Sequence, residues 1–268
     1  MRFFKLLLIK LQLRNNNAFI WYSESKSIKP VKKFKTTKLE LIVSLDSQKK
    51  TLILNTKNFA SGNLINNALL WGVRGNGKST LIKAVFSELS KEYKNLKLIQ
   101  LNKNNIFDIE YIYKLLENLP DTNFIIFIDD LSFEKIDSDY KIIKSTLDGS
   151  LQTQPKNIVL YITSNRRHLM PRDMIDNERS SAIHTDESVE EKISLSDRFG
   201  LWIGFHQLSQ NDYIKIIKAY SDHYKILYND KVRKEAIQWS LERGNRTGRT
   251  AFQFILNIAS KQNLKILI

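Results

Sequence analysis

The chain contains no cysteine. This absence excludes a disulfide framework, a cysteine-ligated zinc site and a thiol nucleophile, and it suits a reducing compartment, so we expect a cytoplasmic protein. Histidine is scarce as well: there are four in 268 residues and no two lie at metal-ligand spacing, which argues against a histidine metal site. The apolar N-terminal run is interrupted by Lys5 and Lys10, and no later run is long enough to cross a bilayer, so we expect no transmembrane segment.

Glycine is also sparse, yet three of the nine glycines lie in the stretch WGVRGNGKST, residues 71–80. The stretch matches the pattern G-x-x-x-x-G-K-[ST], in which successive backbone N–H groups surround phosphate at the start of a helix. In that pattern Lys78 reaches the outer phosphates and Ser79 holds Mg²⁺. The predicted phosphate-binding residues are Gly72, Val73, Arg74, Gly75, Asn76, Gly77, Lys78, Ser79 and Thr80.

The alternative for this stretch is an ordinary glycine turn beside a lysine. Its flanks favour the phosphate loop, because the apolar run ALLW before it suits a buried strand and the residues after it have helical spacing. A strand, a loop and a helix in this order are what the pattern requires.

A regular alternation of strands and helices begins at residue 68. We expect strands at 68–71, 96–101, 123–131, 157–165 and 200–205, and helices at 78–93, 109–119 and 139–151. The alternation and the nearly continuous apolar strands predict an α/β fold with a parallel sheet between layers of helices. Three helical patterns after residue 209 predict a helical module.

These patterns divide the chain into four consecutive parts. They are a basic N-terminal arm (1–30), a lead-in segment with a helix at 46–60 (31–67), a P-loop α/β core (68–207) and a C-terminal helical module (208–268). We expect the first residues to form a helix or strand packed on the core.

The formal net charge of +14 is concentrated near the N-terminus. Residues 1–66 hold thirteen Lys and Arg against three acids, a net of +10. A basic arm of this kind could attract nucleic acid, ribosomes or anionic lipid. The alternative is a coding bias toward lysine, and both interpretations stay open.

Polar side chains follow two of the predicted strands. Asp129 and Asp130 end the apolar run FIIFIDD, and Asn165 (or Ser164) ends YITSN. In a nucleotide-binding sheet, ligands gather at the carboxyl ends of the strands. Asp129 could hold Mg²⁺ through water, and Asp130 could orient or deprotonate an attacking water. The alternative for each position is an ordinary polar turn after a strand.

Three further arginines could meet phosphate. Arg198 lies in SLSDRFG before the fifth strand, and Arg246 and Arg249 lie in RGNRTGRTA at the start of the last helix. A planar, permanently charged guanidinium suits the charge that develops on a transferring phosphoryl group. Each could equally be a surface arginine, and Arg166 and Arg167 receive no predicted role.

The order of these features resembles that of the AAA+ ATPases. The greatest similarity is to a bacterial family known only as a domain of unknown function. In that family the strings LLWG-x-RG-x-GKS, DDLSFE, TSNRRHL, EEKISLSDRFGLW and GR-x-A-x-QF recur in this order. The resemblance extends from about residue 28 to 260.

The resemblance implies a five-stranded parallel sheet of order 5-1-4-3-2 and a C-terminal helical lid over ATP. It implies that Lys78 and Ser79 bind phosphate and Mg²⁺, and that Asp129 is the acid on the metal side. Asn165 would be the first sensor. Arg249 would be the sensor of the lid, with Arg246 as its runner-up. Arg198 would act on the ATP of a neighbouring subunit, which implies a homo-oligomer.

The chain departs from the AAA+ pattern at one catalytic position. Most members have Asp-Glu where this chain has Asp129-Asp130, and Asp is one methylene shorter than Glu. Water would have to approach Asp130 more closely, or Glu134 could substitute if its loop folds back. Slow hydrolysis would be compatible with this departure, and the sequence leaves open whether Asp130 supports fast hydrolysis.

The leading functional hypothesis is an ATPase that couples Mg-ATP hydrolysis to a conformational change on a protein or nucleic-acid client. The alternatives are a nucleotide-dependent switch with negligible hydrolysis and a P-loop kinase for a small molecule. The lid after the last strand argues against the kinase, whose lid arginines usually lie between earlier elements. The sequence identifies no client.

Overall fold

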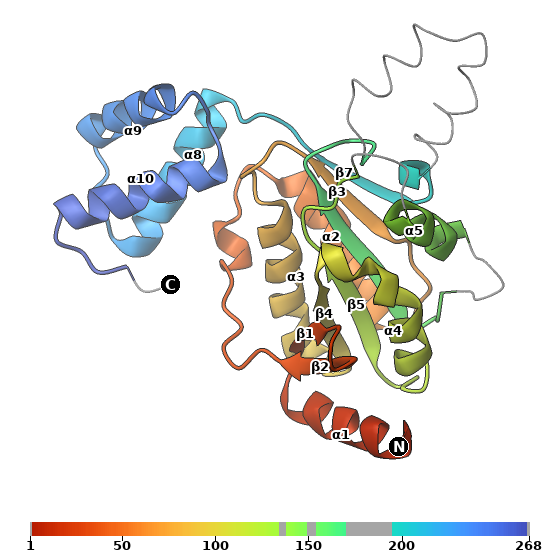
Figure 1. The fold of residues 1–268 in the computed structure, drawn as a ribbon. Coiled ribbons are helices and arrows are strands. Elements are labelled where there is room, and N and C mark those ends of the chain that lie inside the picture. Colours follow the sequence, from red (N-terminus) through yellow and green to blue (C-terminus); the bar gives the residue numbers. More distant parts are fainter. Residues whose placement is uncertain (1, 134–137, 149–153, 170–194, 267–268) are drawn as a thin grey trace, which may run out of the picture. The chain divides into compact units, whose positions relative to one another are not determined.

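The computed structural model describes residues 2–133, 138–148, 154–169 and 195–266 of the chain (Figure 1). Its centre is a seven-stranded sheet of order β2-β1-β4-β5-β6-β3-β7. The strands are β1 (Ala18–Tyr22), β2 (Ser27–Pro30), β3 (Ala68–Gly72), β4 (Leu96–Leu101), β5 (Asn123–Ile128), β6 (Ile158–Ser164) and β7 (Leu201–Phe205). Strands β1, β4, β5, β6 and β3 form a run of parallel neighbours, whereas the pair β1–β2 is antiparallel.

All five predicted strands are present, and their order β7-β3-β6-β5-β4 is the 5-1-4-3-2 that the AAA+ resemblance implies. The sheet has two strands more than predicted, because residues 18–30 form a hairpin that extends it beyond β4. The α/β P-loop architecture is therefore confirmed and the count of five strands is corrected to seven.

By its contacts the chain divides into two compact units, each built from three segments. The sheet unit comprises Met1–Phe34, Leu54–Gly72 and Leu89–Ile203. The loop–lid unit comprises Lys35–Ile53, Val73–Glu88 and Gly204–Ile268.

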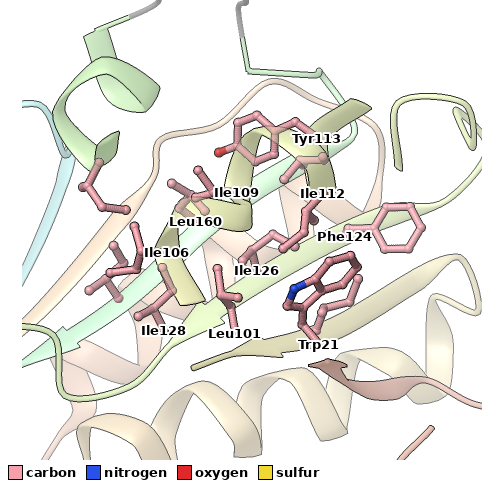
Figure 2. Close-up of a cluster of buried hydrophobic side chains, with 14 of the residues drawn as sticks. Trp21, Leu101, Ile106, Ile109, Ile112, Tyr113, Phe124, Ile126, Ile128 and Leu160 are labelled. Atoms are coloured by element: carbon pink, nitrogen blue, oxygen red, sulfur yellow. The ribbon is translucent and has the colours of Figure 1, made fainter. Parts of the chain in front are cut away.

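The core of the sheet unit lies between the strands and the helices α4 (Ile109–Leu116) and η2 (Lys103–Asp108). Figure 2 shows Ile109 and Ile112 of α4 packed over Ile126 of β5, with Trp21 of β1 in the same cluster. All six residues of β5 are buried, which explains why this strand is continuously apolar rather than alternating. Helix α5 (Ser138–Asp148) also belongs to this unit.

The N-terminal residues are part of this core. Helix α1 (Arg2–Asn15) buries Ile9 and Leu13 in the same cluster as Trp21. The expected helix or strand packed on the core is confirmed, since both a helix and a strand pair are present.

One buried carboxylate joins the hairpin to η2. Asp108, 2 % exposed, accepts a hydrogen bond from Trp21 Nε1 at 2.8 Å and forms an ion pair with Lys26. Burial raises the pKa of Asp108, but hydrogen bonds from Lys26, Ser23 and Trp21 outweigh it, so that the pKa lies below its ordinary value.

The loop–lid unit contains most of α3 (Lys78–Glu92) and the three C-terminal helices α8 (Gln210–Tyr224), α9 (Asp230–Glu242) and α10 (Gly248–Lys261). Each C-terminal helix begins at a side-chain cap, because Ser209, Asn229 and Thr247 each accept a hydrogen bond from a backbone N–H of the first turn. Tyr213 and Phe254 lie in their shared apolar core. The predicted helical module is confirmed.

The lead-in helix has the predicted bounds, since α2 spans Asp46–Ala60. Its first half belongs to the loop–lid unit and its second half to the sheet unit. Among the helices in the described residues, none is both long and apolar enough to cross a bilayer.

Candidate functional site

The glycine-rich stretch forms a tight loop between β3 and α3. Gly72, Gly75 and Gly77 have φ values of 122°, 84° and 90°, a region that favours glycine. Helix α3 begins at Lys78, directly after the loop, and its first turn contains no acid. A helix N-terminus preceded by a glycine loop is an arrangement that accepts phosphate, because its N–H groups point toward the ligand.

Lys78 is 7 % exposed and its Nζ donates a hydrogen bond to the carbonyl oxygen of Val73 at 2.9 Å. The lysine thus folds back over its own loop. A phosphate oxygen could replace the neutral carbonyl oxygen of Val73 as the acceptor of this hydrogen bond. The loop itself is anchored within the loop–lid unit. Val73 N donates to Phe205 O at 2.8 Å and Asn76 Nδ2 donates to His206 O at 2.7 Å.

The start of α10 lies directly against this loop. Arg249 N donates to Gly75 O at 3.0 Å. A Cβ atom at Gly75 would lie 3.1 Å from Thr247 Oγ1 and 3.3 Å from Arg249 Cβ, closer than an ordinary contact. Gly75 is therefore required both by its own backbone conformation and by the helix that packs on it.

The two predicted lid arginines differ in their surroundings. Arg249 is exposed, whereas Arg246 is half-buried. Within the described residues, Arg246 Nε is buried without a hydrogen-bond partner. A buried guanidinium N–H without an acceptor is costly, and a bound anion could supply one. Of the two arginines, Arg246 therefore has the clearer structural reason to bind an anion.

The predicted acids and the predicted sensor lie together in the sheet unit. Asn165 Nδ2 donates to Asp130 Oδ1 at 2.5 Å. Thr163 Oγ1 donates to Asp129 Oδ1 at 2.6 Å and accepts from Asp130 N at 2.9 Å. Both Asp129 and Asp130 follow the carboxyl end of β5, and Asn165 follows that of β6. The structure therefore brings Asp129, Asp130 and Asn165 into one hydrogen-bonded cluster.

Thr163 is the member of this cluster that the sequence analysis missed. It is 1 % exposed and lies inside β6, where its hydroxyl donates to the Asp129 carboxylate and accepts from the backbone N–H of Asp130. A hydroxyl residue that interrupts the apolar run of the strand two positions before Asn165 is the signal that could have identified it. Its partners could not be predicted, because they depend on the register between β5 and β6.

Arg198 follows residues 195–197, which are helical, and is half-buried. Trp202 Nε1 donates to Ser196 O at 2.7 Å, which fixes the turn before the arginine. Arg167, which received no predicted role, lies over the rings of Trp71 at 5.2 Å and Trp202 at 5.8 Å from its guanidinium carbon.

Two other expectations cannot be compared with the structure. Glu134, the substitute proposed for Asp130, lies outside the described residues, and so do residues 190–194 of the string EEKISLSDRFGLW.

The carboxyl ends of β3, β5 and β6 lie at one edge of the sheet, because β3 pairs parallel with β6 and β6 with β5. The phosphate loop starts from this edge after Gly72, and Asp129 and Asn165 lie on it. In the described residues no three His, Asp or Glu side chains are grouped as a metal cage. Mg²⁺ does not need one, since it usually keeps several waters and binds one or two carboxylates together with substrate phosphates.

Comparison with known proteins agrees with this architecture. A family model described as "Protein of unknown function (DUF815)" matches residues 14–262. Among curated proteins, the comparison found no similar sequence.

Solved structures of AAA+ ATPases share the fold. A single-residue variant of RuvB from Thermotoga maritima has 17 % identity and a TM-score of 0.54, over 85 % of this chain and 72 % of RuvB. Domain III of the replication initiation protein DnaA from the same organism has 11 % identity and a TM-score of 0.55, over 84 % of this chain and 88 % of the domain. Orc1 of Aeropyrum pernix, solved in complex with DNA, has 14 % identity and a TM-score of 0.56, over 87 % of this chain and 66 % of Orc1.

Proposed function

The chain belongs to the DUF815 family and has the AAA+ fold, and from this premise we propose that it is an ATPase that couples Mg-ATP hydrolysis to a conformational change. The observation that carries the proposal is the glycine loop with buried Lys78, which starts from the same edge of the sheet as the cluster of Asp129, Asp130 and Asn165. The proposal takes residues 68–207 as the ATPase core and 208–268 as its lid.

The loop supplies the ATP contacts. Backbone N–H groups from Gly72 to Thr80 and the start of α3 bind the phosphates. Lys78 exchanges the Val73 carbonyl for a phosphate oxygen, and Arg246 or Arg249 contacts the phosphates from the lid. Bound Mg²⁺ neutralises charge on the phosphates. Ser79 and, through water, Asp129 are the residues that would hold it.

The cluster at the end of β5 positions the attacking water. Asp130 orients the water and accepts its proton, and Asn165 holds the Asp130 carboxylate by the hydrogen bond of 2.5 Å. The hydroxyl of Thr163 holds the Asp129 carboxylate in position by its hydrogen bond. The carboxylates of Asp129 and Asp130 thus have separate hydrogen-bond partners and separate roles.

In this proposal, Arg198 completes the ATP site of a neighbouring copy of the chain. The active form is therefore a homo-oligomer. A guanidinium that enters from a neighbour stabilises charge on the transferred phosphoryl group and makes hydrolysis depend on assembly. The client is a protein or a nucleic acid, and the absence of cysteine favours a cytoplasmic location.

Steady-state phosphate release with Mg-ATP, measured over a range of protein concentrations, tests the proposal. We expect the rate per molecule to rise with concentration and to vanish in Lys78→Ala. Arg198→Ala should lower turnover by about 10³-fold or more while ATP binding persists. Arg233→Ala, which removes an exposed arginine from α9, is the matched control and should keep the wild-type rate.

Loss of ATP binding in Arg198→Ala would identify this arginine as structural instead. A rate per molecule that is independent of concentration would remove the trans-acting role. Thermal unfolding of each variant shows whether the fold is preserved.

A nucleotide-dependent switch with negligible hydrolysis is the second candidate, because Asp130 is shorter than the usual Glu. This candidate predicts that ATP binds but that no phosphate is released at any protein concentration. The switch would be excluded if the wild-type protein released phosphate rapidly and Asp130→Glu did not increase the rate.

A further inference from the structure

A cavity of about 600 Å³ opens at the edge of the sheet opposite to the acidic cluster. It is bordered by the end of α1, the residues before β4 and the turn before β5. Because β4 and β5 are parallel, these residues lie at the amino ends of the strands, whereas Asp129 and Asp130 follow the carboxyl end of β5. A six-residue strand is about 20 Å long, so the cavity is separate from the proposed ATP site.

The lining of the cavity is strongly basic. Among the described lining residues, four are cations, Lys10, Arg14, Lys94 and Lys97, and one is an acid, Asp121. In the described part of the chain none of the four forms an ion pair. The cavity therefore holds a net charge of +3 (four cations minus one acid) without internal neutralisation.

Lys97 is the buried member of this set, with 5 % of its surface exposed. Its Nζ donates to Asn16 O at 3.1 Å and to Asn17 Oδ1 at 2.6 Å, both neutral acceptors. An ammonium group has three donors, so one remains for a ligand. Burial, and next the charge of Lys94, lower the pKa of Lys97 below its ordinary value, which an anion in the cavity would reverse.

The other lining residues indicate which anion fits. Among the described residues that line the cavity, Asn15, Asn17, Asn95 and Thr122 carry side-chain hydrogen-bond donors, and none is aromatic. Single-stranded nucleic acid is usually bound by bases stacked on aromatic rings, which are missing from this lining. A duplex is instead bound through its phosphates by Lys, Arg and neutral polar side chains.

We propose that this cavity binds the phosphate backbone of double-stranded nucleic acid, without sequence preference, through Lys10, Arg14, Lys94 and Lys97. The site is independent of ATP hydrolysis, and it gives the basic N-terminal region a defined contact surface. Deletion of that region would not test it, since β1 and the buried residues of α1 belong to the core.

The test measures fluorescence anisotropy of a labelled 20-base-pair DNA duplex, in the absence of nucleotide, at salt concentrations from 50 to 200 mM. The pocket variant combines Lys10→Gln, Arg14→Gln and Lys94→Gln, all at exposed positions, and leaves Lys97 in place. Each duplex phosphate contact contributes about 0.9 to the slope of log K against log salt. The salt slope of the variant should therefore be smaller than that of the wild type by about 2.7. Between 50 and 200 mM salt, three such contacts account for a loss of wild-type affinity of about 40-fold.

The matched control combines Lys218→Gln, Lys231→Gln and Lys234→Gln, which removes three exposed charges from the C-terminal helices. It should keep the wild-type slope, and a second duplex of unrelated sequence should bind equally well. An unchanged slope in the pocket variant, or an equal loss in the control, would overturn the proposal. If the pocket variant lost binding to phosphatidylglycerol vesicles but kept its binding to the duplex, the cavity would be assigned to lipid instead.

Discussion

At the scale of single residues, Asp130 has an unusual backbone conformation. Its φ of 54° lies in the left-handed region, which among non-glycine residues Asp and Asn adopt most readily. Its N–H and its carboxylate both have partners, Thr163 and Asn165. The backbone thus gives a structural reason for a short side chain here, where the AAA+ pattern has Glu.

Asp130→Asn separates the chemical role of this residue from its structural one. Asn tolerates the same backbone conformation but cannot accept the proton of a water. We expect thermal unfolding close to that of the wild type and phosphate release lower by about 10² to 10⁴-fold. Phosphate release and thermal unfolding, measured on the same preparation, check both statements. Full turnover in the variant would leave Asp130 with a structural role only.

The sequence predicted those candidate site residues whose place follows from the order of strands and loops along the chain. Asp129, Asp130 and Asn165 were predicted because each follows an apolar strand, and they do lie together. Thr163 was missed, because its hydrogen bonds depend on the alignment of β5 with β6, which no local pattern records.

At the scale of elements, the contact between α10 and the phosphate loop is built around Gly75. The residue has a φ of 84°, and a Cβ there would lie 3.1 Å from Thr247 Oγ1. Gly62, at the end of α2, has a similar φ of 89°, but a Cβ at this position would have no neighbour within 4 Å. The two glycines share the same backbone requirement and differ in their neighbours.

Gly75→Ala should therefore be more destabilising than Gly62→Ala. Both variants place alanine in the left-handed region, at a cost of about 1–2 kcal/mol. Only Gly75→Ala also pushes against α10, which adds about 1–3 kcal/mol of overpacking. Thermal unfolding of the two variants gives the comparison, and equal shifts would mean that α10 moves away from the loop without cost.

The sequence analysis expected a helix or strand near the N-terminus, but it did not predict that β1 and β2 form a hairpin that joins the sheet beside β4. Its strands have five and four residues, and the turn between them, residues 23–26, contains neither Gly, Pro nor Asn. Such short strands depend on the existing sheet beside β4 for their partners. The five strands from β3 to β7 and the helices between and after them were predicted because their periodicity lies within one segment of chain.

At the scale of the whole molecule, charge determines how the protein responds to acid. The chain already carries +14 at neutral pH, and acid adds to this charge as carboxylates are protonated. Asp108 is a buried member of these groups, and it joins the β1–β2 hairpin to η2.

The lowered pKa of Asp108 gives the sign of the effect. A carboxylate whose folded pKa is depressed contributes stability above its unfolded pKa of about 3.9 and loses it as the pH falls through the folded value. We expect Asp108→Asn to lower the free energy of unfolding by about 1–3 kcal/mol at pH 6. The difference from the wild type should shrink below pH 4.

Urea unfolding from pH 2.5 to 7, followed by tryptophan fluorescence, measures this difference, since Trp21 is itself a partner of Asp108. A difference that stays constant over the whole range would mean that Asp108 acts by packing and not by its charge. Asp121→Asn, at an exposed position, is the control and should leave the pH profile unchanged.

The edge strand β2 restricts how copies of this protein can assemble. Proteins with an open sheet edge are prone to join edge to edge, each adding its backbone to the ladder of the next. Here the edge is only four residues long, ends at Pro30, which has no N–H to donate, and carries exposed Lys29. Continuous sheets across subunits are therefore disfavoured at the β2 edge, and contacts between copies at this edge would have to be made by side chains.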